Sequence, residues 1–95
     1  MTTPIYKVQY AYFGWNVSGT ADNNMSKITG TLQDYLDKHA SATVLPVYPG
    51  SNNPFQDPAP GKSKSFTALI KVNNVDRLFA VCENCNLDLT TGATV

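Results

Sequence analysis

The segment Pro54–Gly61 constrains this chain more than any other part of the sequence. It contains three prolines and a glycine, and an apolar, β-branched stretch, Ser65–Val72, follows shortly after it. Proline fixes φ and lacks a backbone N–H, so the segment can continue neither a helix nor a central strand, whereas Ser65–Val72 has the composition of a strand. The segment contains no good nucleophile, general base or metal cage. A stiff loop in front of a strand presents a shaped surface, and we expect that surface to bind a partner rather than to react with it.

The size and charge of the chain limit what this partner can be. The 95 residues predict a single domain over 1–95, with seven basic residues balancing seven acidic ones and charged residues making up only 15%. A protein that follows nucleic-acid phosphates needs a positive surplus, so we expect no nucleic-acid partner and a neutral, polar ligand instead. The N-terminus Met1–Pro4 lacks a basic and apolar signal region, and no apolar run approaches a membrane span. The expected location is therefore cytoplasmic, without membrane insertion.

The N-terminal third predicts a strand, a loop and a helix. Ile5–Gly14 alternates as a strand, and Trp15–Asn23 has the composition of a polar loop. Alternation places Val8, Tyr10 and Tyr12 on one face of the strand and Lys7, Gln9 and Ala11 on the other. After an N-cap at Asp22–Asn24 comes a predicted amphipathic helix of about four turns. Its apolar positions are Met25, Ile28, Leu32, Tyr35, Leu36 and His39.

The C-terminal half predicts further strands. Thr43–Tyr48 is a second strand, and Pro46 favours an edge position or a bulge because proline cannot donate to a ladder. Leu87–Leu89 predicts a short last strand. Between them, Val75–Cys82 is ambiguous: its apolar spacing fits a helix, whereas Asn73–Asn74 fits the two-residue turn of a hairpin because asparagine tolerates positive φ.

Four short motifs of the chain match a known sequence pattern. They are Tyr12-Phe13-Gly14, Ile28-Thr29-Gly30-Thr31-Leu32-Gln33, Phe55-Gln56-Asp57-Pro58-Ala59-Pro60-Gly61-Lys62-Ser63-Lys64-Ser65-Phe66 and Glu83-Asn84-Cys85-Asn86-Leu87-Asp88-Leu89. Their order resembles a small domain of unknown function that is found at the C-terminus of a mitochondrial J-domain co-chaperone and as free-standing bacterial and fungal proteins. Gln56 stands where that pattern has glycine, and Phe66 where it has leucine. The resemblance implies the hairpin over Val75–Cys82, and it implies no catalytic residues.

Reactive side chains are present, but none forms a convincing catalytic or metal-binding set. Cys82 and Cys85 are a lone Cys-x-x-Cys without two further zinc ligands, and we expect two semi-buried thiols at a strand end. His39 lies where a cation complements a helix dipole. Asp34 and Asp37 fit a solvated helix face, and Lys62 and Lys64 fit a solvated loop. We therefore expect no enzyme activity, no cofactor and no metal.

The expected fold is α+β, an antiparallel sheet of about five strands with one amphipathic helix packed on one face. The expected function is non-enzymatic binding of neutral saccharides, of galactose or mannose type, because flat aromatic rings and amide or carboxylate groups together hold sugars. Trp15 and Tyr48 would supply the platform, and the hydrogen bonds would come from Asn16, Asn52, Asn53, Gln56 and Asp57.

In size, low charge and lack of a signal region, the chain is also similar to small cytosolic lectins of mushroom fruiting bodies. Because single-site sugar affinity is weak, we expect a homo-oligomer, with the tyrosine-rich sheet face and the Pro46 edge as places of self-association. The alternative function is a protein-interaction module that binds a peptide or a protein face through its sheet or its proline-rich loop.

Overall fold

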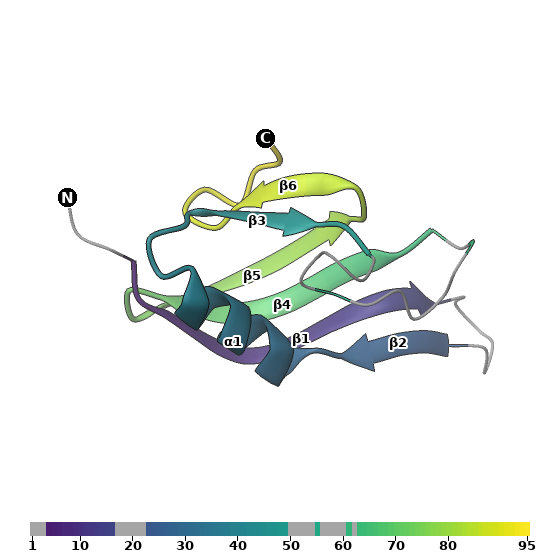
Figure 1. Cartoon of the computed structure of the whole chain (residues 1–95), viewed down its shortest axis with the longest axis horizontal. Coiled ribbons are helices and arrows are strands. Elements are labelled where there is room, and N and C mark those ends of the chain that lie inside the picture. The colour runs from purple at the N-terminus through teal and green to yellow at the C-terminus, as the bar shows by residue number, and fades with distance from the viewer. Residues whose placement is uncertain (1–3, 17–22, 50–54, 56–60, 62) are drawn as a thin grey trace.

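The computed structural model describes residues 4–16, 23–49, 55, 61 and 63–95 (Figure 1). The elements in these ranges are β1 (Tyr6–Asn16), β2 (Asn23–Lys27), α1 (Thr29–Lys38), β3 (Val44–Val47), β4 (Ser65–Val72), β5 (Val75–Cys82) and β6 (Cys85–Asp88). All strand pairs between them are antiparallel. The α+β class and the helix packed on a sheet are thus confirmed.

The strands form two sheets rather than the predicted single sheet of about five strands. The described residues contain a four-stranded sheet in the order β2-β1-β4-β5 and a two-stranded sheet of β3 and β6. The chain leaves the larger sheet at Asn84, whose φ is 63° and whose N–H donates to the Val47 carbonyl at 2.7 Å. This turn directs β6 onto β3. Pro46 pairs with Asn86 in that ribbon, so the predicted edge position of its strand is confirmed, and β6 starts two residues before the predicted Leu87.

The β4–β5 hairpin settles the ambiguity at Val75–Cys82 in favour of a strand. Asn73 and Asn74 have φ values of 51° and 68°, the pair of positive φ angles that a tight two-residue hairpin turn requires. The Asn73 backbone N–H donates to the Ile5 carbonyl at 2.9 Å, and its Oδ1 accepts from the Ile5 N–H at 2.9 Å. The turn therefore also fastens the hairpin to the start of β1. The helical alternative is wrong.

A β-bulge in β1 reverses the predicted faces of that strand. Val8 pairs with Ile70, but Tyr10 pairs with Leu69, so Gln9 is the extra residue. Beyond the bulge the alternation is shifted by one residue, and Ala11 enters the core while Tyr10 and Tyr12 turn outward. The predicted grouping of Val8 with Tyr10 and Tyr12 is wrong for this reason.

The helix is shorter than predicted because its first residues pair as a strand. Residues 23–27 form β2 against the end of β1, and α1 begins at Thr29 with Ile28 as its N-cap, not at Asp22–Asn24. The Ile28 N–H donates to the Ala11 carbonyl at 2.8 Å, and the Thr29 hydroxyl accepts from the Ala11 N–H at 3.0 Å. These bonds to β1 position the start of the helix. In residues 23–27, pairing with β1 outweighs the apolar spacing that predicted a helix.

One core lies between the four-stranded sheet and the elements that cover a single face of it. In Figure 1, α1 lies against β1, and the β3–β6 ribbon lies beyond β5. Leu32 and Leu36 of α1 are buried, and the alternation in β4 buries every second residue. The largest fully buried side chains are Phe13, Phe55, Phe66, Leu32, Leu45, Ile70, Leu87, Leu89 and Val47.

Candidate binding surfaces

Trp15 lies in β1 and not in the predicted loop. Its backbone pairs with Asn24, and its side chain is partly exposed. By strand alternation it is on the same face as Phe13, the core face of the sheet. Asn16 is the last residue of β1, where its backbone pairs with Asn23. The predicted loop from Trp15 to Asn23 is therefore wrong at both of its ends, which belong to β1 and β2.

The other predicted sugar contacts fall in or beside the proline-rich segment. Tyr48 directly follows β3 and is partly buried. The remaining predicted contacts, Asn52, Asn53, Gln56 and Asp57, lie outside the described residues. Only Trp15 and Tyr48 thus have described side chains among the predicted binding residues.

Phe55, within the same segment, is a core position that sequence reasoning missed. Its side chain is fully buried, and its ring centroid lies 5.3 Å from that of Phe13 and 5.6 Å from that of Phe66. The sequence feature that could have predicted this burial is a single aromatic residue among prolines and asparagines. We call this packing the Phe55 anchor: Phe55 contacts Phe13 of β1, two residues before Trp15, and Phe66 of β4.

The outer face of the four-stranded sheet is the second candidate surface. The core cluster lies on the opposite face, and we call this outer side the open face. Tyr12 and Leu78 are 37% and 66% exposed, and the Tyr10 ring lies 6.1 Å from the Tyr12 ring. Register places Leu69 between Tyr10 and Leu78. The open face is therefore an aromatic and aliphatic strip, which contains Tyr10 and Tyr12 of the predicted tyrosine-rich face but not Val8.

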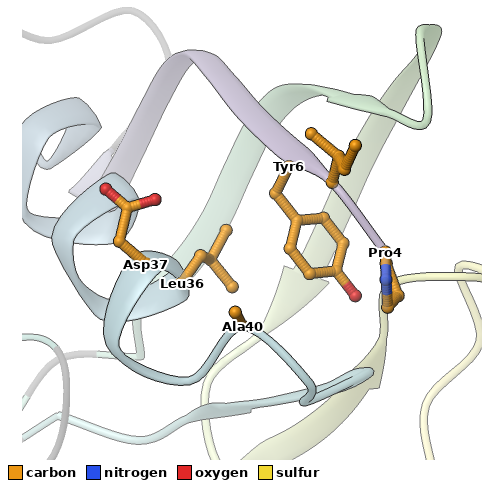
Figure 2. A pocket seen from close by; sticks show the side chains of 6 residues that line it. Pro4, Tyr6, Leu36, Asp37 and Ala40 are labelled. Carbon is orange, nitrogen blue, oxygen red and sulfur yellow. The ribbon is translucent and has the colours of Figure 1, made fainter. Parts of the chain in front are cut away.

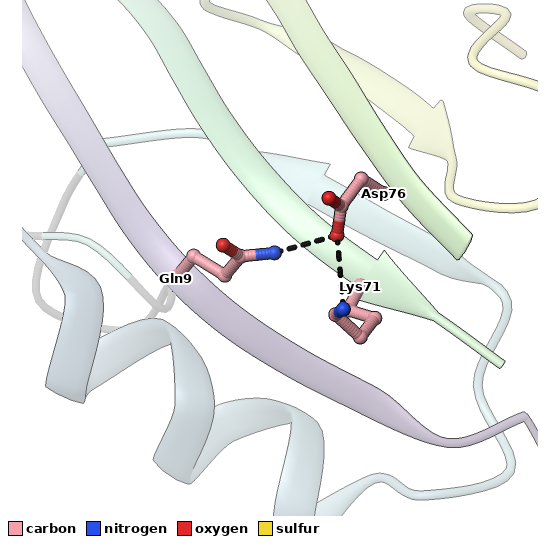
Figure 3. Close-up of polar contacts among 3 residues, drawn as sticks. All are labelled: Gln9, Lys71 and Asp76. Atoms are coloured by element: carbon pink, nitrogen blue, oxygen red, sulfur yellow. Dashed lines mark hydrogen bonds and ion pairs between the residues drawn. The ribbon is translucent and has the colours of Figure 1, made fainter. Parts of the chain in front are cut away.

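A polar cluster lies on the open face near the hairpin turn (Figure 3). The Gln9 side-chain amide donates to Asp76 Oδ1 at 2.7 Å, and Lys71 Nζ lies 3.4 Å from the same oxygen. The bulge residue Gln9 thus reaches across β4 to a residue of β5. Lys7 and Lys27 also belong to the open face by register, so its described cations outnumber its described carboxylates.

A shallow cavity of about 290 Å³ lies between the start of β1 and the end of α1 (Figure 2). Its lining residues are Pro4, Ile5, Tyr6, Leu36, Asp37 and Ala40. The Tyr6 hydroxyl donates to the Ala42 carbonyl at 2.9 Å, and burial, with a smaller effect of Asp88, raises the pKa of this phenol. The Asp37 carboxylate accepts from the Gln33 amide at 3.0 Å. The lining pairs no nucleophile with a base, so the cavity offers apolar contact and hydrogen bonds.

Lys64 contradicts the prediction of a solvated loop lysine. Its Nζ lies 3.2 Å from Glu83 Oε2, and its side chain is 3% exposed. Lys62 lies outside the described residues. Lys64 is therefore buried and paired with a carboxylate, and it is not an anion site on the surface.

The two cysteines next to Glu83 are both free. The Cys85 thiol donates to the Cys82 carbonyl at 3.0 Å, and burial, with a smaller effect of Cys82, raises the pKa of Cys85. Cys85 is partly buried, but Cys82 is exposed, so the prediction of two semi-buried thiols is wrong for Cys82. His39 is exposed just beyond α1, with its ring 4.4 Å from that of Tyr35. In the described ranges no three metal-ligating side chains come together.

No known family model matches the chain, and neither curated proteins nor solved structures match it. Within the described residues, α1 is too short and too polar to cross a membrane.

Proposed function

We propose that this chain is a non-enzymatic carbohydrate-binding protein for neutral saccharides of galactose or mannose type. The observation that carries the proposal is the Phe55 anchor. In it Phe55, the described residue of the asparagine- and proline-rich segment, packs against Phe13 of β1, two residues before the partly exposed Trp15. The proposal is supported by this proximity of Phe55 to the strand that carries Trp15.

The chemistry of neutral sugars supports a binding site that includes Trp15. A sugar ring presents a C–H face to an aromatic side chain and hydroxyls to amides and carboxylates. Trp15 is the only tryptophan of the chain, and the segment around Phe55 holds Asn52, Asn53, Gln56 and Asp57. The neutral net charge of the chain also favours an uncharged ligand.

The test is a glycan array with the protein displayed at high density, followed by displacement with free sugar. Trp15→Ala should abolish binding, while Tyr12→Ala should retain it, because Tyr12 is an exposed aromatic of the same strand on the opposite face. If Tyr12→Ala loses binding and Trp15→Ala does not, the sugar site lies on the open face and not at Trp15. An array without any sugar-displaceable signal would overturn the proposal.

The second candidate function is a protein-interaction module, which the open face favours. Its apolar strip is accompanied by Lys7, Lys27 and Lys71, against Asp76 as the described carboxylate. Charge complementarity selects a partner surface that combines apolar side chains with carboxylates. Capture of such a partner should be lost in Tyr12→Ser and weakened by salt, with Trp15→Ala as the unaffected control. If partner binding is unchanged by salt and by Tyr12→Ser, the open face is not the interaction surface.

A further inference from the structure

We infer that β5 pairs edge to edge with β5 of a second copy of this chain, so that two four-stranded sheets join into one. The inference concerns assembly and does not depend on sugar binding. It starts from the position of β5 at the end of the sheet order β2-β1-β4-β5.

The hairpin register determines which backbone groups of β5 face outward. Val72 and Val75 flank the two-residue turn and form a hydrogen-bonded pair, and such pairs alternate along an antiparallel ladder. The Glu83 N–H continues this alternation by donating to the Lys64 carbonyl at 2.9 Å. The N–H and C=O groups of the even-numbered residues therefore point away from β4. We call this row, formed by Asp76, Leu78, Ala80 and Cys82, the β5 edge.

Three other strand edges of the described residues each carry a feature that disfavours further pairing. Pro46 removes a donor from β3. The outer side of β6 is covered by the C-terminal residues, because Thr94 bridges Leu87 and the Val95 N–H donates to the Asn86 carbonyl at 2.8 Å. At the opposite end of the large sheet, β2 is short and polar and ends in Lys27. These are the usual protections of an edge strand.

Beyond Asp76 the β5 edge carries no such protection. From Leu78 to Cys82 the strand has neither a charge nor a proline, and Leu78 is 66% exposed. Among the described residues no strand pairs with this side of β5. A long apolar edge of this kind is a template for another strand.

The charges of the strand indicate that this other strand is a second copy. The uncharged stretch Leu78–Cys82 is centred on Ala80, with Arg77 before it and Glu83 after it. In an antiparallel pair about a two-fold axis at Ala80, Leu78 lies opposite Cys82, and the two Arg77 residues lie at opposite ends of the uncharged stretch. A register shifted toward the turn would place Arg77 opposite Arg77. The zero net charge adds no repulsion between copies.

Sedimentation equilibrium across the micromolar range, combined with amide hydrogen exchange by NMR, tests the inference. We expect a reversible dimer whose formation slows exchange of the Leu78 and Ala80 amides. The Phe79 amide, which is bonded to β4, should be protected at every concentration. A chain that stays monomeric, or dimerises without protecting Leu78 and Ala80, would overturn the inference.

A charge exchange at the two-fold axis gives a sharper test. Ala80→Lys places two ammonium groups opposite each other and should weaken dimerisation at least about tenfold, as should Ala80→Glu. An equimolar mixture of the two variants should dimerise again. Thr67→Lys is the matched control, because Thr67 lies opposite Ala80 on the same face but one strand inward. If Thr67→Lys breaks the dimer and Ala80→Lys does not, the copies stack face to face, and edge pairing is excluded.

Discussion

Lys64 and Glu83 form an ion pair of 3.2 Å whose side chains are 3% and 17% exposed. The pair joins Lys64 of the Phe55–Phe66 motif to the first residue of the Glu83–Leu89 motif. A second bond, from the Glu83 N–H to the Lys64 carbonyl, runs parallel to it. The two motifs are therefore parts of one structural unit at the point where β5 turns into β6.

Removing the carboxylate from this pair should destabilise the protein strongly. Glu83→Gln removes a carboxylate that lies 3.2 Å from a buried ammonium, a change that typically costs about 3 kcal/mol of unfolding free energy. The double variant Lys64→Met with Glu83→Gln should cost less than the sum of the two single changes. Urea unfolding measures all three. Lys71→Met breaks the exposed pair with Asp76 and, as the control, should cost less than about 1 kcal/mol. Equal effects of Glu83→Gln and Lys71→Met would contradict the burial of the first pair.

The hairpin turn should depend on residues that tolerate positive φ. Asn74 has a φ of 68°, so Asn74→Ala should cost about 1 kcal/mol, while Asn74→Gly should be neutral or stabilising. Thermal unfolding of both variants checks this difference. The turn assignment fails if alanine is tolerated as well as glycine at this position.

The Phe55 anchor should contribute to global stability, although Phe55 lies in a proline-rich segment. Phe55→Ala removes a fully buried ring that contacts Phe13 and Phe66, and we expect a loss of about 3–5 kcal/mol in chemical denaturation. Phe55→Leu keeps most of the apolar volume and should cost much less. An unchanged denaturation midpoint for Phe55→Ala would show that the ring is not part of the core.

Asp88 should make the fold sensitive to acid. The Thr90 hydroxyl, 2.6 Å from Asp88 Oδ1, lowers the pKa of this carboxyl most, and the Thr90 and Thr91 backbone N–H groups lower it further against an opposing effect of burial. Because the folded state favours the carboxylate, its stabilising effect is complete above the ordinary aspartate pKa of about 4 and is lost as the pH falls through the lowered value.

An NMR titration of the Asp88 carboxyl carbon measures this pKa directly. Thr90→Val should raise the pKa toward its ordinary value, and the denaturation midpoint of this variant should depend less on pH below about 4. A titration curve of Asp88 that is the same with and without the Thr90 hydroxyl would contradict the assignment.

The sequence predicted those parts of the fold that depend on local chemistry. The bounds of β4 follow from composition, and the edge position of Pro46 follows from its missing N–H. The Asn73–Asn74 turn was one of two open alternatives until the family resemblance favoured it. Each of these features is decided within a few neighbouring residues.

The features that the sequence did not predict depend on distant partners. The strand β2 has residues at helical spacing, and only its pairing with β1 makes it a strand. The bulge at Gln9 is visible only against the register of β4, and it decides that Tyr10 and Tyr12 face outward. Likewise, Lys64 resembles a solvated lysine until Glu83 lies beside it. Of the predicted sugar contacts, Trp15 was assigned to a loop because its partner strand was read as part of a helix.

The intrinsic fluorescence of the single tryptophan tests the central claim most directly, because Trp15 is both the reporter and the proposed platform. Titration with galactose, mannose and their oligosaccharides should shift or quench the Trp15 emission saturably for at least one sugar, and excess of the same free sugar should release the protein from a glycan surface. If the emission stays unchanged across the panel while the protein remains folded, Trp15 does not hold a sugar and the proposed function is wrong.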